Sequence, residues 1–127
     1  MENQQFTEDH EWVCADGDCF VIGISKYAVD ELGEIVYVEL PEIGSLVTKG
    51  DEFGSVESVK TVSGIYSPIS GTVVSVNADL INAPEQINQS PYEDGWLIKV
   101  SPDPHTVADD MQSLMSYDDY KRFIDTL

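Results

Sequence analysis

Basic residues are scarce in this chain: six lysines and arginines stand against 24 aspartates and glutamates, for a formal net charge of −18. Because nucleic-acid binding requires a basic patch that neutralises phosphates, the sequence argues against a nucleic-acid partner. The same excess of acid argues against an anionic membrane surface. It favours solubility and fast, salt-sensitive encounter with the basic surfaces of partner proteins.

Long apolar runs are absent too, and none approaches the ~18 residues that a transmembrane helix requires. The first twelve residues, MENQQFTEDHEW, lack the basic start and apolar core of a signal peptide, and their acidity does not suit a transit peptide. We therefore expect a cytoplasmic protein of bacterial type, or a mitochondrial matrix protein only if a transit peptide has been removed. With 127 residues, 42% of them apolar, the chain is expected to be one domain and a monomer.

Cysteine is rare. The two cysteines, Cys14 and Cys19, flank the pair Asp16-Gly17, which is a strong signal for a hairpin with a two-residue loop. Two isolated cysteines are too few for a structural zinc site, and a cytosolic protein usually keeps such thiols reduced. We expect two free thiols on neighbouring strands, with a disulfide or redox pair as the alternative.

Signatures of catalysis are also missing. The two histidines are His10 and His105, and no second histidine follows His10 at the spacing of a zinc-binding helix. Asp16 and Asp18 resemble the start of a calcium loop, but the later acidic ligands are absent. There is no Gly-x-Ser-x-Gly elbow and no phosphate-binding glycine loop. The sequence therefore predicts neither a metal site nor an enzyme with its own active site.

The residues that are present favour a mostly β fold with short helices, of the α+β class. A short helix is expected over residues 25–33, because Ser25 is a suitable N-cap and Gly33 supplies a C-terminal stop. Another is expected within residues 77–88, capped by Asn77. Alternating apolar residues with glycine or proline breakers predict strands within residues 11–25, 34–41, 44–59, 64–76 and 95–101.

The last part of the chain has a different character. Over residues 103–127 glycine is absent and apolar residues fall at helical spacing, which predicts two short helices, the second capped by Ser116. We interpret their apolar stripe as packing against the sheet, with a partner-binding role as the alternative. The expected organisation is a β core over residues 1–102 followed by a helical segment over residues 103–127.

Lys60 lies between two similar stretches. Residues 42–58 and 66–77 each present a turn glycine followed by short alternating strands. A repeat joined at a tight turn predicts the two quasi-symmetric halves of a small β-sandwich or flattened barrel, with Lys60 at the tip of a hairpin. An exposed lysine on a rigid turn is a suitable handle for a covalently attached arm, and amide formation would remove its charge. The alternative is an ordinary solvated lysine.

The chain resembles the glycine cleavage system H-protein family, whose members carry lipoic acid. The resemblance implies the lipoyl/biotinyl hammerhead fold with extra helices, and lipoic acid in amide linkage on Lys60. A biotin carrier would be expected to show methionines beside its lysine, where this chain has Val59 and Thr61. The segments that carry the resemblance are EDHEWV, GISKYAVDELGEIVYVELPEIG, DEFGSVESVK, YSPISGTVVSVN and PYEDGWLIKV.

The resemblance implies a shuttle in glycine catabolism and one-carbon metabolism, not an enzyme. Glycine decarboxylase (P protein) would transfer an aminomethyl group onto the oxidised lipoyl disulfide. Aminomethyltransferase (T protein) would release ammonia and pass the one-carbon unit to tetrahydrofolate. Dihydrolipoyl dehydrogenase (L protein) would reoxidise the dithiol. A lipoate ligase or lipoyltransferase would attach the cofactor.

Three further residues are candidates for the site. Glu57, three residues before Lys60, is placed to orient a ligase or to pair with the lysine, unless it is simply a solvated acid. By resemblance, the DHEW segment holds the ammonium group of the loaded arm. Within that segment Glu11 is the candidate for the acid that binds the ammonium group, and Ser63, near the lysine turn, is a second candidate. The alternative is that Glu11 only faces solvent.

Two departures from the family pattern stand near these candidates. Many members have two alanines where this chain has Thr61 and Val62, and some have a histidine where it has Tyr27. Both departures bear on how the arm is sheltered or which partner is preferred. Two other functions stay open: a lipoyl donor that serves 2-oxoacid dehydrogenase complexes, and an unmodified acidic interaction domain.

Overall fold

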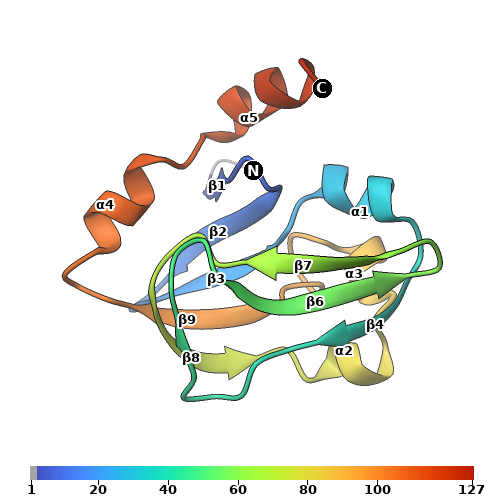
Figure 1. Ribbon diagram of the computed structural model, residues 1–127, viewed down its shortest axis with the longest axis horizontal. Helices are drawn as coiled ribbons and strands as arrows, with labels where there is room; N and C mark the ends of the chain where they lie inside the picture. The colour runs from blue at the N-terminus through green and yellow to red at the C-terminus, as the bar shows by residue number, and fades with distance from the viewer. Residues whose placement is uncertain (1–2) are drawn as a thin grey trace.

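The computed structural model describes residues 3–127 and is built from two antiparallel sheets with short helices around them (Figure 1). The larger sheet has the strand order β1-β2-β3-β9-β8-β5, and the smaller has the order β4-β6-β7. The strands are β1 (Gln4–Phe6), β2 (Glu11–Asp16), β3 (Cys19–Ile24), β4 (Ile35–Glu39), β5 (Leu46–Val47), β6 (Glu52–Ser58), β7 (Val62–Tyr66), β8 (Gly71–Val76) and β9 (Ile98–Pro102). The helices are α1 (Lys26–Leu32), α2 (Asp79–Asn82), α3 (Gln86–Gln89), α4 (Val107–Gln112) and α5 (Tyr117–Ile124).

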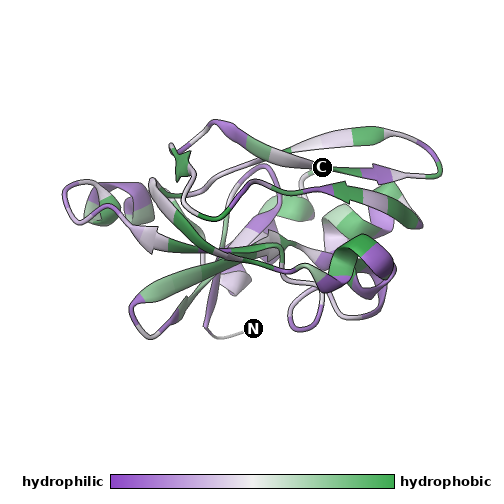
Figure 2. Cartoon of the chain, turned by 90° about the horizontal axis from the view of Figure 1, so that it is seen from below, coloured by the Kyte–Doolittle hydropathy of each residue, from purple (hydrophilic) through white to green (hydrophobic). Residues whose placement is uncertain are grey.

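Both sheets contribute to one main core. Much of the hydrophobic sequence lies in the strands (Figure 2), and several strands carry continuous apolar runs, such as CFVIGI in β3. The larger sheet supplies residues such as Val13 and Ile98, and the smaller supplies Val38, Val56 and Ile65. The mostly β fold with short helices is thus confirmed, and its strands form two open sheets rather than a closed barrel within residues 3–127.

The repeat explains how the two sheets are joined. β5 and β6 come from the first stretch and β8 from the second, while β7 lies mostly in the segment between the two stretches. β5 pairs with β8 in the larger sheet, and β6 pairs with β7 in the smaller one. Lys60 falls in the turn between β6 and β7, which lies between the two stretches, as the repeat predicted.

The β2–β3 hairpin forms where the Asp-Gly pair predicted it. Its two-residue loop is Gly17 and Asp18, one residue later than the signal, because Asp16 still pairs with Cys19. Gly17 takes a positive φ of 61°, which glycine tolerates without a steric penalty. Cys14 and Cys19 lie on the two neighbouring strands, and both are free thiols.

Local capping signals were right for α1 and wrong for α2. The Ser25 hydroxyl accepts a hydrogen bond from the Ala28 N–H, and Gly33 ends α1 at a φ of 83°. By contrast, the N-cap of α2 is Ala78, without a side-chain hydrogen bond. Asn77 is buried and donates its amide to two carbonyl oxygens in the loop before β9. These two bonds orient the Asn77 side chain toward that loop, and no side-chain hydrogen bond caps α2.

The C-terminal segment forms the two expected helices. The Ser116 hydroxyl caps α5 by accepting from the Asp119 N–H. Tyr120 of α5 stacks on Phe6 of β1 with ring centroids 4.4 Å apart, inside a second small apolar cluster that includes Trp12. The apolar stripe is therefore core packing, as interpreted. None of the helices in the described part of the chain combines the length and the hydrophobicity needed to cross a membrane.

Candidate functional site

Lys60 occupies the turn at the end of the β6–β7 hairpin, which projects from the smaller sheet (Figure 1). Its side chain is exposed. Within residues 3–127 the ion pairs are formed by three other cations, and the Lys60 ammonium takes part in none. No neighbouring carboxylate therefore has to be displaced before its Nζ atom can be acylated.

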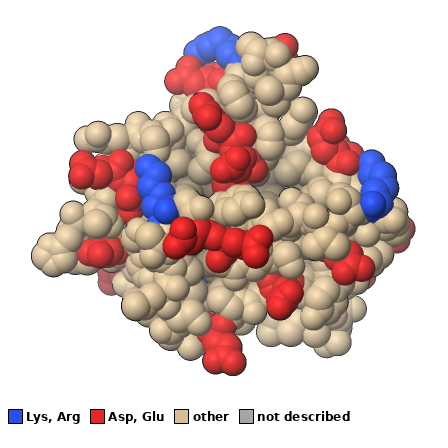
Figure 3. Space-filling view, in the orientation of Figure 1, with Lys and Arg blue, Asp and Glu red and all other residues tan. Residues whose placement is uncertain are grey.

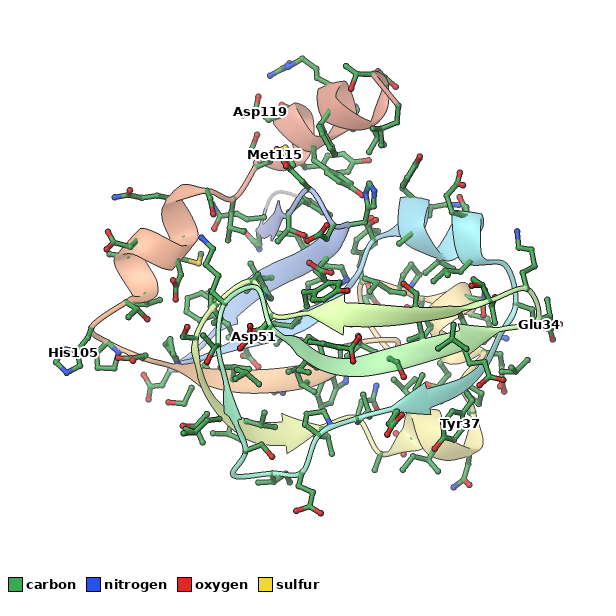
Figure 4. The ribbon with its side chains drawn as sticks, viewed as in Figure 1. Glu34, Tyr37, Asp51, His105, Met115 and Asp119 are labelled. Atoms are coloured by element: carbon green, nitrogen blue, oxygen red, sulfur yellow. The ribbon has the colours of Figure 1, made fainter. Side chains whose placement is uncertain are left out.

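Ser58 holds the turn in shape. Its side chain is 5% exposed, and its hydroxyl accepts from the backbone N–H groups of Lys60 and Thr61, both at 3.1 Å. The Val59 N–H donates to the Glu34 carbonyl at 3.0 Å, and Glu34 lies beside the hairpin tip (Figure 4). Sequence reasoning missed Ser58, although a serine just before a turn is a known signal for side-chain bonds to turn amides.

The stem of Lys60 lies against the end of α1. A Cβ atom at Gly33 would stand only 3.1 Å from Lys60 Cε, so the absence of a side chain there makes room for the stem. The residues present thus fit a covalently attached group: an exposed amine, a pinned turn and a supported stem.

A pocket of about 310 Å³ opens between α1 and β7, and we call it the α1–β7 pocket. Leu32, which lines it, directly precedes Gly33, so the pocket reaches the end of α1 that the Lys60 stem contacts. Its walls are mostly apolar, and two acids, Asp9 and Glu31, add negative charge. Its lining residues are Asp9, His10, Ile24, Tyr27, Ala28, Glu31, Leu32, Ser63, Gly64 and Ile65.

The structure places Ser63 in this pocket but Glu11 outside it. Ser63 lies on β7, and its hydroxyl donates to the Gly64 carbonyl at 3.4 Å. Glu11 lines a neighbouring pocket of about 290 Å³, which shares Asp9 with the first. The sequence therefore named Ser63 and the segment that contains Asp9, but chose Glu11 as the acid of that segment and missed Glu31.

Glu11 is buried, with 2% of its surface exposed, so the alternative that it faces solvent is wrong. Its Oε1 atom accepts from the Thr7 hydroxyl at 2.7 Å, and its Oε2 atom accepts from the Tyr66 N–H at 3.4 Å. Burial raises the pKa of this carboxyl to about 7, because desolvation disfavours the ionised form more than these hydrogen bonds favour it. Near neutral pH, Glu11 is therefore only partly ionised.

Glu57 stands in an exposed cross-strand row one step from the lysine turn. It pairs with Tyr37 of β4 on one side and with Val62 of β7 on the other, and these two side chains are 55% and 62% exposed. Among the described residues it forms no ion pair with Lys60. Acidic side chains gather over the middle of this face of the molecule, and its cations lie nearer the margins (Figure 3).

Comparisons with known proteins agree with one another. The family model described as "Glycine cleavage H-protein" matches residues 4–127. A glycine cleavage system H protein of Listeria monocytogenes is 52% identical over 120 residues, which cover 94% of each chain. One from Halalkalibacterium halodurans is also 52% identical, over 94% of this chain and 91% of its own. The crystal structure of an H protein from Mycobacterium marinum superimposes with a TM-score of 0.84 at 37% identity, covering 94% of both chains.

Proposed function

Because the chain belongs to the glycine cleavage H-protein family, we propose that lipoic acid is attached in amide linkage to Nζ of Lys60. The chain is a lipoyl-carrying shuttle of the glycine cleavage system, a carrier component and not an enzyme. The names of the relatives favour this role over lipoyl donation to 2-oxoacid dehydrogenase complexes. The observation that carries the assignment is the exposed Lys60 amine, free of ion pairs within residues 3–127, on a turn pinned by Ser58.

The bound lipoyl group supplies a disulfide that takes up the aminomethyl group of glycine and is itself reduced. The chain contributes the placement of that group. Attachment at a projecting hairpin allows several enzymes to reach it in turn, and tethering keeps it at high local concentration in each complex. The proposed partners are glycine decarboxylase, aminomethyltransferase, dihydrolipoyl dehydrogenase and a lipoate ligase or lipoyltransferase.

Intact mass spectrometry after incubation with a lipoate ligase, ATP and lipoate tests the attachment. We expect the mass to increase by one lipoyl group. A chain that keeps its bare mass would overturn the carrier assignment and leave the unmodified interaction domain. Glycine-dependent release of CO₂ by purified decarboxylase, with and without the lipoylated chain, then tests the shuttle role itself.

We expect Glu57→Ala to slow lipoylation roughly threefold to tenfold without unfolding the protein, because a ligase that approaches Lys60 meets this exposed acid. The measurement is the initial lipoylation rate with purified ligase, at low and at high salt. The matched control is Glu42→Ala, which removes an exposed acid from the loop before β5. Equal rates for both variants and the wild type would show that Glu57 is only a solvated residue.

The α1–β7 pocket is the proposed shelter for the loaded arm. Its apolar walls suit the aliphatic part of the arm, and Asp9 and Glu31 suit a terminal ammonium group, since charge-assisted hydrogen bonds to carboxylates are strong. The Ser63 hydroxyl offers a further acceptor. Glu11 lines the neighbouring pocket, which shares Asp9 with this one, and is proposed to act on the arm through its charge. Shelter matters because one water hydrolyses an aminomethyl thioether to a thiol, formaldehyde and ammonium.

Glu11→Gln keeps the side-chain shape and removes its charge. We expect the loaded protein to release ammonia roughly threefold faster without any enzyme, because one attractive charge near the ammonium is lost. Since the pKa of Glu11 is about 7, the difference from wild type should grow as the pH rises from 6 to 8. Lipoylation itself should be normal.

The control is Glu8→Gln, which changes an exposed acid in the same neighbouring pocket as Glu11. Its charge is screened by water, so a smaller effect is expected. A loaded Glu11→Gln protein that decays at the wild-type rate at every pH would remove Glu11 from the shelter and leave Asp9 and Glu31 as its acids.

A further inference from the structure

His10 has an unusual backbone. It is the only non-glycine residue within residues 3–127 with a positive φ, which is 71°. Such a conformation is costly for an L-residue and persists only where the surroundings impose it. Two backbone hydrogen bonds do so here: the His10 N–H donates to the Thr7 carbonyl at 3.1 Å, and the Ser25 N–H donates to the His10 carbonyl at 2.8 Å. This conformation accompanies the placement of the imidazole in the wall of the α1–β7 pocket.

A chain of three side chains runs from the start of α1 through α5 to this imidazole. The Tyr120 hydroxyl lies 2.7 Å from Ser25 Oγ and 2.7 Å from His10 Nδ1. Ser25 and Tyr120 are 0% and 2% exposed, so no bulk water completes their hydrogen bonds. We call this arrangement the Ser25–Tyr120–His10 chain.

The role of Ser25 as the cap of α1 determines which group donates in each of these hydrogen bonds. Its oxygen accepts from the Ala28 N–H as the cap of α1. Within the described residues, the acceptor left for its own proton is the Tyr120 oxygen. Tyr120 then donates its proton to His10 Nδ1. With Nδ1 as an acceptor, the proton of the neutral ring is carried by Nε2.

A charged His10 would disrupt this order. An imidazolium carries protons on both nitrogens, so Nδ1 would donate to the Tyr120 oxygen. Either the Tyr120 or the Ser25 proton would then lose its acceptor inside the protein, which is unfavourable for a buried hydroxyl. The chain therefore stabilises the uncharged ring.

We infer that the Ser25–Tyr120–His10 chain holds His10 as the uncharged Nε2–H imidazole, so that Asp9 and Glu31 keep the α1–β7 pocket negative for the cationic end of the arm. Tyr120 and Ser25 are positioning residues, which makes the C-terminal helix α5 a part of the site. The inference rests on the proposed function, in which this pocket shelters the arm.

The surroundings of His10 agree with an uncharged ring. Burial lowers the pKa of His10, while the nearby carboxylates of Asp9 and Glu31 act in the opposite direction. Burial also raises the pKa of Tyr120 to about 12, so the phenol keeps its proton. Two other titratable groups lie near the ring: Tyr27, whose ring centroid is 4.7 Å from that of His10, and Glu11, the next residue in the sequence. The two cations of α5 have other partners, because Lys121 lies over the Tyr117 ring and Arg122 pairs with Asp119.

Nuclear magnetic resonance of the imidazole nitrogens on the unmodified chain tests the inference directly. The chain has two histidines, and exposed His105, far from the hairpin tip (Figure 4), serves as an internal reference. In the wild type we expect His10 to be the Nε2–H tautomer and to titrate below the ordinary pH range of a histidine. A wild-type Nδ1–H tautomer would overturn the inference.

Tyr120→Phe removes the hydroxyl and keeps the ring that stacks on Phe6. We expect His10 to titrate roughly half a pH unit higher and to populate the Nδ1–H tautomer as well. Tyr117→Phe is the matched control on the same helix. Its ring also contacts Phe6, and its hydroxyl makes no side-chain hydrogen bond within residues 3–127, so His10 should not change. Unchanged His10 resonances in Tyr120→Phe would also overturn the inference.

The loaded protein provides a second readout. At pH 6 we expect Tyr120→Phe to release ammonia roughly threefold faster than wild type or Tyr117→Phe, because a charged His10 offsets the two acids. His10→Asn, uncharged at every pH and tolerant of positive φ, should decay more slowly than wild type below pH 6. If His10 titrates higher in Tyr120→Phe but ammonia release does not change, the proposed role of the pocket is wrong. If ammonia release is faster but the titration of His10 does not change, the proposed role of the Ser25–Tyr120–His10 chain is wrong. Normal lipoylation of Lys60 in each variant shows that neither outcome comes from failure of the carrier assignment.

Discussion

Lipoylation should be lost completely in Lys60→Ala, while the fold stays intact. The side chain is exposed and forms no ion pair in the described part of the chain, so its removal costs little stability. The turn keeps its shape because its bonds involve backbone atoms and the Ser58 hydroxyl. Intact mass after ligase treatment measures the modification, and circular dichroism measures the fold.

Two further variants sharpen this test. Lys60→Arg keeps the positive charge but offers no acylable amine, so it should also remain unmodified. Lys49→Ala should be lipoylated normally, because the Lys49 ammonium donates to the Asp110 carbonyl and the Ser113 hydroxyl and does not stand on the hairpin. A lipoyl adduct that persists in Lys60→Ala would place the attachment on another residue.

Gly71→Ala should lower the free energy of unfolding by about 3 kcal/mol or more. β8 lies between β5 and β9, and Gly71 pairs with Val47 on one side and with Pro102 on the other. A Cβ atom at Gly71 would overlap the Ser101 carbonyl oxygen and stand 3.0 Å from Pro102 Cα. Because these are backbone atoms, no side-chain rotation relieves the overlap. Urea unfolding of the unmodified chain measures the effect.

Gly44→Ala is the control for this substitution. Gly44 has a φ of 95°, and a Cβ there would meet nothing within 4 Å, so only backbone strain of about 1–2 kcal/mol is expected. If Gly71→Ala costs no more than Gly44→Ala, the close approach of β9 is not the reason for glycine at this position.

The parts of the fold that the sequence predicted correctly depend on local chemistry. Ser25 and Gly33 mark the ends of α1 through bonds and angles within a few residues, and the Asp-Gly pair marks a hairpin for the same reason. The lysine turn is also local, because Ser58 and Lys60 are close neighbours. Asn77 shows the limit: its partners, Asp94 and Trp96, come from a later loop and take its side chain away from the helix.

The parts that the sequence did not predict depend on distant contacts. Glu11 is buried by elements that include Tyr66, which is 55 positions away in the sequence, so its raised pKa has no local signal. The α1–β7 pocket exists only because α1 packs beside β7, which brings Glu31 near Ser63. The resemblance to a family identified the lysine and the DHEW segment, but only the folded chain shows that Asp9 and Glu31 are the pocket acids.

The two departures from the family pattern now have structural places. Tyr27 lines the α1–β7 pocket and its ring contacts His10, so that departure changes the wall of the proposed shelter. Val62 belongs to the exposed row beside the lysine turn, so that departure changes the surface that partner enzymes meet. Neither residue alters Nζ of Lys60, the proposed attachment atom.

The position of β9 sets the order in which the molecule can assemble during synthesis. β9 is the last strand made, yet it stands between β3 and β8 in the larger sheet. Until Ile98 and the residues after it leave the ribosome, the nascent chain can hold only two separate pieces of that sheet, β1-β2-β3 and β8-β5. Such long-range pairing slows folding. The larger sheet, which shares its core with the sheet of the Lys60 hairpin, is therefore completed only after β9 has been made, although β4, β6 and β7 of the hairpin's own sheet all come earlier in the chain.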